Sequence, residues 1–128
     1  MATTDSPETA SKYPPRRPHE IDQCVDRFLT TMCDTSRRYI LELLASPQEE
    51  PDPVIERRSG DIARLIGLSA ATTSEHLRQL SSLGLIRSRR EGNVVYYRIS
   101  NQLVARSFHD FLMALDSYCT SLRGNNSP

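Results

Sequence analysis

The hydrophobic and polar positions over residues 59–99 predict two short helices followed by a β-hairpin. After Ser59, which we expect to be an N-cap, apolar residues repeat on one helical face as far as Gly67. Gly67 is suited to end this helix, and Ser69 is suited to cap a second one. The predicted buried face of the second helix carries Thr73, His76, Leu77, Leu80 and Leu83. Two β-type segments joined at residues 91–93 complete the pattern.

Three further helices are predicted around this unit. Apolar residues fall on one face from Glu20 to Met32, and Asp34 is suited to cap a helix from Thr35 to about Ala45. After Ser100 or Asn101 a long last helix carries an apolar seam typical of a surface for self-association. Its seam residues are Val104, Phe108, Phe111, Leu115, Tyr118 and Leu122.

The resulting fold class is mainly α with a small β-hairpin (α+β), arranged as a winged helix-turn-helix of about five helices plus a two-stranded wing. Residues 20–122 form the predicted domain, and residues 1–19 and 123–128 form disordered tails. Residues 46–56, which carry three prolines and four acidic residues, are expected to be an exposed loop. We find no apolar run long enough for a membrane span and no signal pattern, so a cytoplasmic protein without a membrane partner is expected.

Charge favours a nucleic-acid partner for this unit. The chain is neutral overall, yet residues 57–98 hold eight arginines against Asp61, Glu75 and Glu91. This local excess matters because phosphates act over roughly 8–10 Å at physiological salt. The residues predicted to contact DNA are Ser69, Ala71, Thr72, Ser74, Glu75, Arg78, Gln79, Arg89, Arg90 and Asn93.

Glu75 leaves two interpretations open on the predicted reading helix. A carboxylate cannot face phosphate without repulsion, so in the groove it would accept a hydrogen bond from a cytosine amino group. Alternatively it pairs with Arg78, three residues further along the helix, and orients that side chain. Base reading is the interpretation that we prefer from sequence.

The segments DIARLIGLSAATTSEHLRQLSSLGLIRSRREGNVVYYRIS and MCDTSRRYILELL resemble the ArsR/SmtB family of bacterial repressors. Ala70 and Glu75 depart from residues common in that family. The resemblance covers about residues 21–122 and implies a homodimeric repressor that binds a pseudo-palindromic double-stranded operator in a bacterial or archaeal cytoplasm. It also implies that the first and last helices form the dimer interface, which adds Ile21, Val25 and Phe28 to the seam.

The resemblance also places the family's two metal sites on particular residues of this chain. A thiolate pair before the first helix of the motif would fall on Arg58 and Gly60. The second site, on the last helix, would fall on Asn101, Leu103, Ala114 and Ser117. These residues are poor zinc ligands, so neither standard site is expected and no cofactor is predicted.

Three cysteines are the remaining effector candidates: Cys24, Cys33 and Cys119. Their odd number favours free thiols in a reducing compartment. Cys24 and Cys119 of different subunits could approach as a redox pair or a soft-metal site, and the alternative is that they act as small hydrophobic residues. His76 is expected to be structural, and His109 and Asp110 to be solvated.

Three function classes follow from these patterns. The leading one is a sequence-specific DNA-binding regulator, in which two reading helices enter successive major grooves. A winged helix used only for protein contacts is the second, because Glu75 lies on the reading helix. A constitutive repressor or architectural protein is the third. The sequence contains no nucleophile–base–acid set or phosphate loop, so it does not predict an enzyme.

Overall fold

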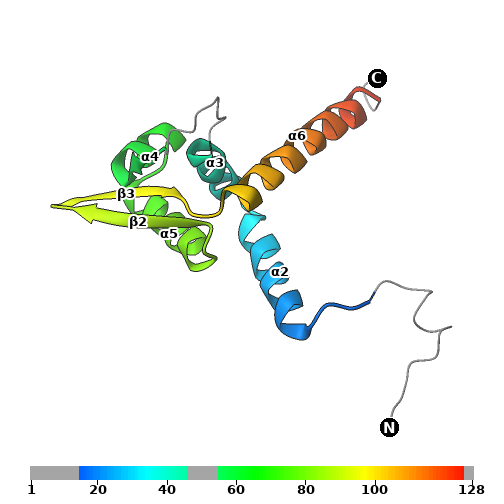
Figure 1. Cartoon of the computed structure of the whole chain (residues 1–128). Helices are drawn as coiled ribbons and strands as arrows, with labels where there is room; N and C mark the ends of the chain where they lie inside the picture. The colour runs from blue at the N-terminus through cyan, green and yellow to red at the C-terminus, as the bar shows by residue number, and fades with distance from the viewer. Residues whose placement is uncertain (1–14, 46–54, 126–128) are drawn as a thin grey trace, which may run out of the picture.

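A computed structural model describes residues 15–45 and 55–125. Three helices and three strands pack around one core, and the first and last helices reach outward (Figure 1). In chain order the elements are α2 (His19–Met32), α3 (Thr35–Leu44), β1 (Arg57–Arg58), α4 (Ser59–Ile66), α5 (Ala70–Ser82), β2 (Ile86–Glu91), β3 (Val94–Ile99) and α6 (Gln102–Asn125). The described residues do not include 1–14 of the predicted tail at 1–19, nor 46–54 of the predicted loop at 46–56, nor residues 126–128. No helix in the described ranges is both long and apolar enough to span a membrane.

The core gathers the apolar face of each central element. α3, α5 and the sheet contribute most of it, and α2, α4 and α6 each add a residue from the end or face that meets them. Its fully buried members include Ile40, Leu41, Leu44, Ile62, Leu77, Leu80 and Ile86. Burying each such side chain is worth about 1.5–3 kcal/mol, so the core fixes how α5 sits on the rest of the domain.

Local capping sets the ends of the two helices of the motif. Gly67 adopts a left-handed conformation with φ of 82°, where a side chain would be strained. The Ser69 hydroxyl accepts a hydrogen bond from the Thr72 amide at 3.1 Å, which caps α5 as predicted. The prediction for Ser59 was wrong: α4 already includes Ser59, and Arg58 occupies the N-cap position without a side-chain cap bond. β1 ends at Arg58 and α4 begins at Ser59, so the N-cap position is occupied by the last residue of the strand.

The wing is a three-stranded antiparallel sheet, one strand more than the sequence predicted. β3 lies in the middle, with β2 on one side and the two-residue strand β1 on the other. Tyr96 is paired with Arg89 on β2 and with Arg58 on β1, so the three side chains share one face of the sheet. This short third strand escaped prediction because only its pairing with β3, about 38 residues later, defines it.

The first and last helices project from the core in different directions (Figure 1). Asp34 caps α3 through the Arg37 amide at 3.0 Å, and Asn101 caps α6 through the Val104 amide at 3.0 Å. α2 begins at His19, one residue before the predicted boundary. α6 continues to Asn125, so residues 123–125 are helical rather than part of a disordered tail.

Thr73, on the buried face of α5, allows a test of what an unpartnered buried hydroxyl costs in stability. Its side chain is 1% exposed, and its Oγ1 has no hydrogen-bond partner among the described residues. A buried hydroxyl without a partner costs free energy, so Thr73→Val should raise the free energy of unfolding by about 1 kcal/mol. Urea unfolding measures this change, with Thr30→Val, at an exposed threonine on α2, as the matched control. A less stable Thr73→Val would mean that the hydroxyl is hydrogen-bonded in solution.

Candidate nucleic-acid interface

The first turn of α5 presents small side chains to solvent. Ala71, Thr72 and Ser74 are all exposed, as their predicted role requires. The Ser69 hydroxyl donates to Thr72 Oγ1 at 3.0 Å, in addition to capping the helix. Ser69 and Thr72 are therefore already bonded to each other, and Ala71 and Ser74 are left as the open surface of this turn.

One turn further along, Glu75 is the centre of a small bonded cluster. Arg78 Nε donates to Glu75 Oε1 at 3.0 Å and Arg78 Nη2 donates to Glu75 Oε2 at 2.6 Å. Gln79 Nε2 donates to the same Oε2 at 2.9 Å, so Gln79, predicted to contact DNA, points to Glu75 instead. The bonds from Arg78 and Gln79 lower the pKa of Glu75 to about 2, so its charge persists throughout the neutral range. In the free chain Glu75 takes the pairing arrangement.

The buried side of α5 is fixed by an arginine that the sequence did not single out. Arg37 on α3 donates through Nε to the Thr31 carbonyl at 2.6 Å, and its Nη1 lies 3.2 Å from His76 Nδ1. Arginine only donates, so Nδ1 accepts and a neutral His76 carries its proton on Nε2. This contact ties α2, α3 and α5 together and agrees with the structural role predicted for His76.

On the wing, Arg89 is held by acidic side chains. Its Nε and Nη2 donate to the Glu56 carboxylate at 2.9–3.1 Å, and its Nη1 donates to Glu91 at 3.1 Å. The guanidinium carbon lies 4.5 Å from the centre of the Tyr96 ring. Arg89 therefore makes internal ion pairs where the sequence predicted a free phosphate ligand. Glu56 and Tyr96 were missed because only the strand register brings them to Arg89.

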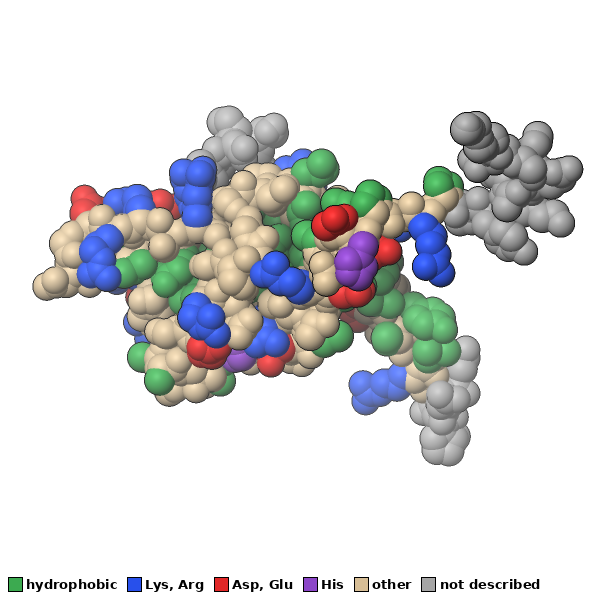
Figure 2. Space-filling model, turned by 90° about the horizontal axis from the view of Figure 1, so that it is seen from below, with side chains coloured by type: hydrophobic (Ala, Val, Ile, Leu, Met, Phe, Trp, Pro, Cys, Tyr) green, Lys and Arg blue, Asp and Glu red, His purple; other side chains and the backbone are tan. Residues whose placement is uncertain are grey.

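The other wing arginines are differently placed. Arg87 and Arg90 are exposed and Arg98 is half-buried, and within residues 15–45 and 55–125 none of the three makes an ion pair. Asn93 is exposed in the turn after Gly92, at the tip of the hairpin. Figure 2 shows basic side chains over the wing at the left of the molecule, with acidic side chains beside some of them. The surface thus combines free arginines with paired ones.

The residues predicted for the dimer interface divide into two sets. Phe28, Val104 and Phe108 are half-buried against the chain's own core, where the Phe28 and Phe108 rings meet edge to face at 5.4 Å. These three residues therefore also pack within their own domain, and their place in a dimer interface stays a prediction. The remaining six are exposed in the single chain: Ile21, Val25, Phe111, Leu115, Tyr118 and Leu122. Two of the six lie on α2 and four lie along one face of α6. Exposed apolar side chains gathered in this way are typical of an association surface.

This arrangement agrees with what comparisons with known proteins show. A model of the bacterial regulatory protein arsR family matches residues 34–88, which run from the cap of α3 into β2. The homodimeric winged helix-turn-helix DNA-binding domain of a possible ArsR-family regulator from Mycobacterium bovis, solved by NMR, is 30% identical, with a TM-score of 0.66. The match covers 93% of this chain and 94% of that domain. The chain belongs to the ArsR family.

Two curated relatives match this ArsR-family chain to different extents. The nodulation protein NolR of Rhizobium meliloti is 30% identical over 98 residues, which cover 77% of this chain and 73% of NolR. The cadmium resistance transcriptional regulatory protein CadC of Listeria innocua is 51% identical over 41 residues, or 32% of this chain. That second match spans only 34% of the length of CadC. The relatives are named as a regulatory protein and a nodulation protein.

The three thiols of this ArsR-family chain are all free and exposed, so the interpretation of them as buried hydrophobic residues does not hold within one chain. Cys24 lies on α2, Cys33 follows it, and Cys119 lies on α6. The described residues bring no three His, Cys, Asp or Glu side chains together in a way that could hold a metal ion. The positions of the second family metal site lie at the cap and along α6, where Leu103, Ala114 and Ser117 are exposed.

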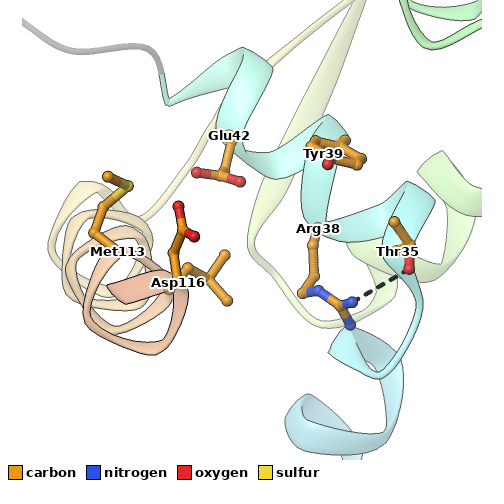
Figure 3. A pocket seen from close by; sticks show the side chains of 7 residues that line it. Thr35, Arg38, Tyr39, Glu42, Met113 and Asp116 are labelled. Atoms are coloured by element: carbon orange, nitrogen blue, oxygen red, sulfur yellow. Dashed lines mark hydrogen bonds between the residues drawn. The ribbon is translucent and has the colours of Figure 1, made fainter. Parts of the chain in front are cut away.

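A shallow depression of about 310 Å³ lies between α3 and α6 (Figure 3). The carboxylates of Glu42 and Asp116 point toward each other across it, and Arg38 donates to Thr35 Oγ1 at 3.3 Å at its other end. Glu42 also accepts from His109 Nδ1 at 3.0 Å. His109 therefore links α6 to α3, and the prediction of a simply solvated side chain was wrong.

Proposed function

We propose that this chain is a homodimeric repressor that binds a pseudo-palindromic operator in double-stranded DNA. The observation that carries the proposal is the reading helix α5, whose exposed first turn lies on a firmly packed core beside a wing with free arginines. A helix presented in this way suits the major groove, and wing arginines suit the flanking phosphates. Membership of the ArsR family supports the same function.

The homodimer rests on the exposed apolar residues of α2 and α6. Phe111 and Tyr118 are 55% and 59% exposed in the single chain, and they continue along the face that carries Val104 and Phe108. Leaving such side chains in water forgoes about 25 cal/mol per Å² of apolar surface, which a second copy would recover. Two copies would also place two reading helices for two half-sites, as a pseudo-palindromic operator requires.

A salt titration with mixed-sequence duplex DNA tests the DNA-binding proposal. Binding should weaken steeply between about 50 and 200 mM salt, because each neutralised phosphate releases counterions. Arg90→Ala should weaken binding to all sequences alike and reduce the salt slope by roughly one unit, since Arg90 is exposed and makes no ion pair with any residue that the structure describes. Arg106→Ala, on α6, serves as the control for a lost surface charge.

A protein-interaction adaptor would show no steep dependence on salt and would not distinguish Arg90→Ala from Arg106→Ala. A loss confined to a few sequences would instead mean that Arg90 reads bases. Either result would change the proposed role of the wing.

A further inference from the structure

The wing carries an acidic side chain, Glu56, that binds the guanidinium of Arg89. Glu56 directly precedes β1 and Arg89 lies on β2, so the two come from opposite edges of the sheet, and the Arg89 guanidinium lies over Tyr96 on the central strand β3. The Glu56 carboxylate accepts hydrogen bonds from Nε and Nη2 of the guanidinium, in the forked geometry that arginine also uses for phosphate. Glu91 accepts a hydrogen bond from Nη1, so all three nitrogens of the guanidinium donate to carboxylates.

The local charge makes this arrangement unusual for a DNA-facing arginine. Arg89 with Glu56 and Glu91 sums to a net charge of −1, so the two carboxylates cancel the positive charge that Arg89 alone would offer to phosphate. Arg89 donating hydrogen bonds to Glu56 lowers the pKa of that carboxyl, and Arg98 lies near enough to add to the effect. Glu56 is therefore ionised at neutral pH, and its hold on Arg89 is lost only as the pH falls below the ordinary carboxyl range.

We propose that Glu56 is a specificity-determining residue, which occupies Arg89 as an internal substitute for phosphate and so weakens binding to DNA of arbitrary sequence. A phosphate that is placed firmly against the wing displaces Glu56 from Arg89. A loosely docked duplex does not displace Glu56, and Arg89 then contributes nothing to its binding. This inference rests on the proposed DNA-binding function and adds a residue outside the reading helix that limits non-specific affinity.

Glu56→Gln tests the proposal in the full-length protein. With a short duplex of mixed sequence as the probe, the variant should bind about three- to tenfold more tightly at low salt, and its salt slope should steepen by about one phosphate contact. Asp110→Asn, an exposed residue on α6, removes the same charge far from the sheet and should leave both quantities unchanged. Thermal unfolding confirms that both variants are folded.

An Arg89→Ala background separates two effects of Glu56: its occupation of Arg89 and the repulsion of DNA by its charge. If Glu56 acts by occupying Arg89, then Glu56→Gln has no further effect once Arg89 is gone. Tighter binding that persists in the Arg89→Ala background would overturn the proposal, and so would unchanged or weaker binding of Glu56→Gln alone. Should Glu56→Gln fail to fold, Glu56→Asp keeps the charge but withdraws the carboxylate, and the proposal requires it still to bind more tightly. A wild-type chain that binds no duplex at low salt would refute the DNA-binding function itself, which is a different outcome.

Discussion

Replacing Phe111 with Lys is expected to convert the dimer into monomers and to weaken operator binding by about 100-fold or more. The Phe111 ring is 55% exposed within one chain, so the substitution removes little from the fold of the single domain. In a dimer the same position would bury an unpaired ammonium group, which costs several kcal/mol. Each monomer would then reach only one half-site, and the gain from simultaneous binding of two half-sites would be lost.

Sedimentation velocity and binding to a duplex selected from a random pool measure the two effects of Phe111→Lys. Met113→Lys is the matched control, because Met113 is 51% exposed and lies on the opposite face of the same helix. Met113→Lys should leave the dimer intact and should not weaken DNA binding. An added lysine raises non-specific attraction to DNA, so weaker binding by Phe111→Lys cannot arise from charge alone. A tight dimer in Phe111→Lys would rule out the seam on α6 as the interface.

Glu75→Gln is expected to tighten binding to mixed-sequence DNA by about three- to tenfold and to leave base preference intact. The reason is the cluster on α5, where Glu75 neutralises Arg78 through two hydrogen bonds. Removing the carboxylate charge frees the guanidinium for phosphate and removes a negative charge from the reading surface. Because the depressed pKa of about 2 keeps Glu75 ionised, the difference between variant and wild type should be constant from about pH 5 to 8.

Binding across single-base variants of a selected operator decides between the two roles of Glu75. If Glu75 reads a cytosine, Glu75→Gln should instead relax preference at one position by about 1–3 kcal/mol and leave non-specific affinity nearly unchanged. Ser74→Ala, on the same exposed face, is the control for a change that removes no charge. Arg78→Ala combined with Glu75→Gln should cancel the gain if the pairing role holds.

The local features of the motif could be predicted because they depend on residues close in sequence. Gly67 ends α4 by its left-handed conformation, and Ser69 caps α5 through an amide three residues later. The apolar spacing of α5 likewise identified Leu77 and Leu80, which are fully buried. Such signals require no knowledge of the rest of the fold, because backbone sterics and helix period act over a few residues.

The third strand of the wing and the role of Glu56 could not be predicted in the same way. β1 spans only two residues, too few for an alternating pattern, and exists through its pairing with β3. Glu56 looked like the end of an acidic loop, and only the order of the strands brings it within hydrogen-bond distance of Arg89. Cross-strand contacts of this kind depend on the order of the strands in space, which the local sequence does not contain.

The sequence by itself determined that arginines are concentrated in this part of the chain and that an apolar seam runs along the last helix. Only the tertiary structure decided which of these groups are free. Arg89 is bound to Glu56, whereas Arg90 is open to solvent, although they are neighbours in sequence. Phe108 packs into its own domain, whereas Phe111 on the same seam stays exposed. The physical reason is that composition fixes which charges and apolar groups are present, while packing fixes which of them already have partners.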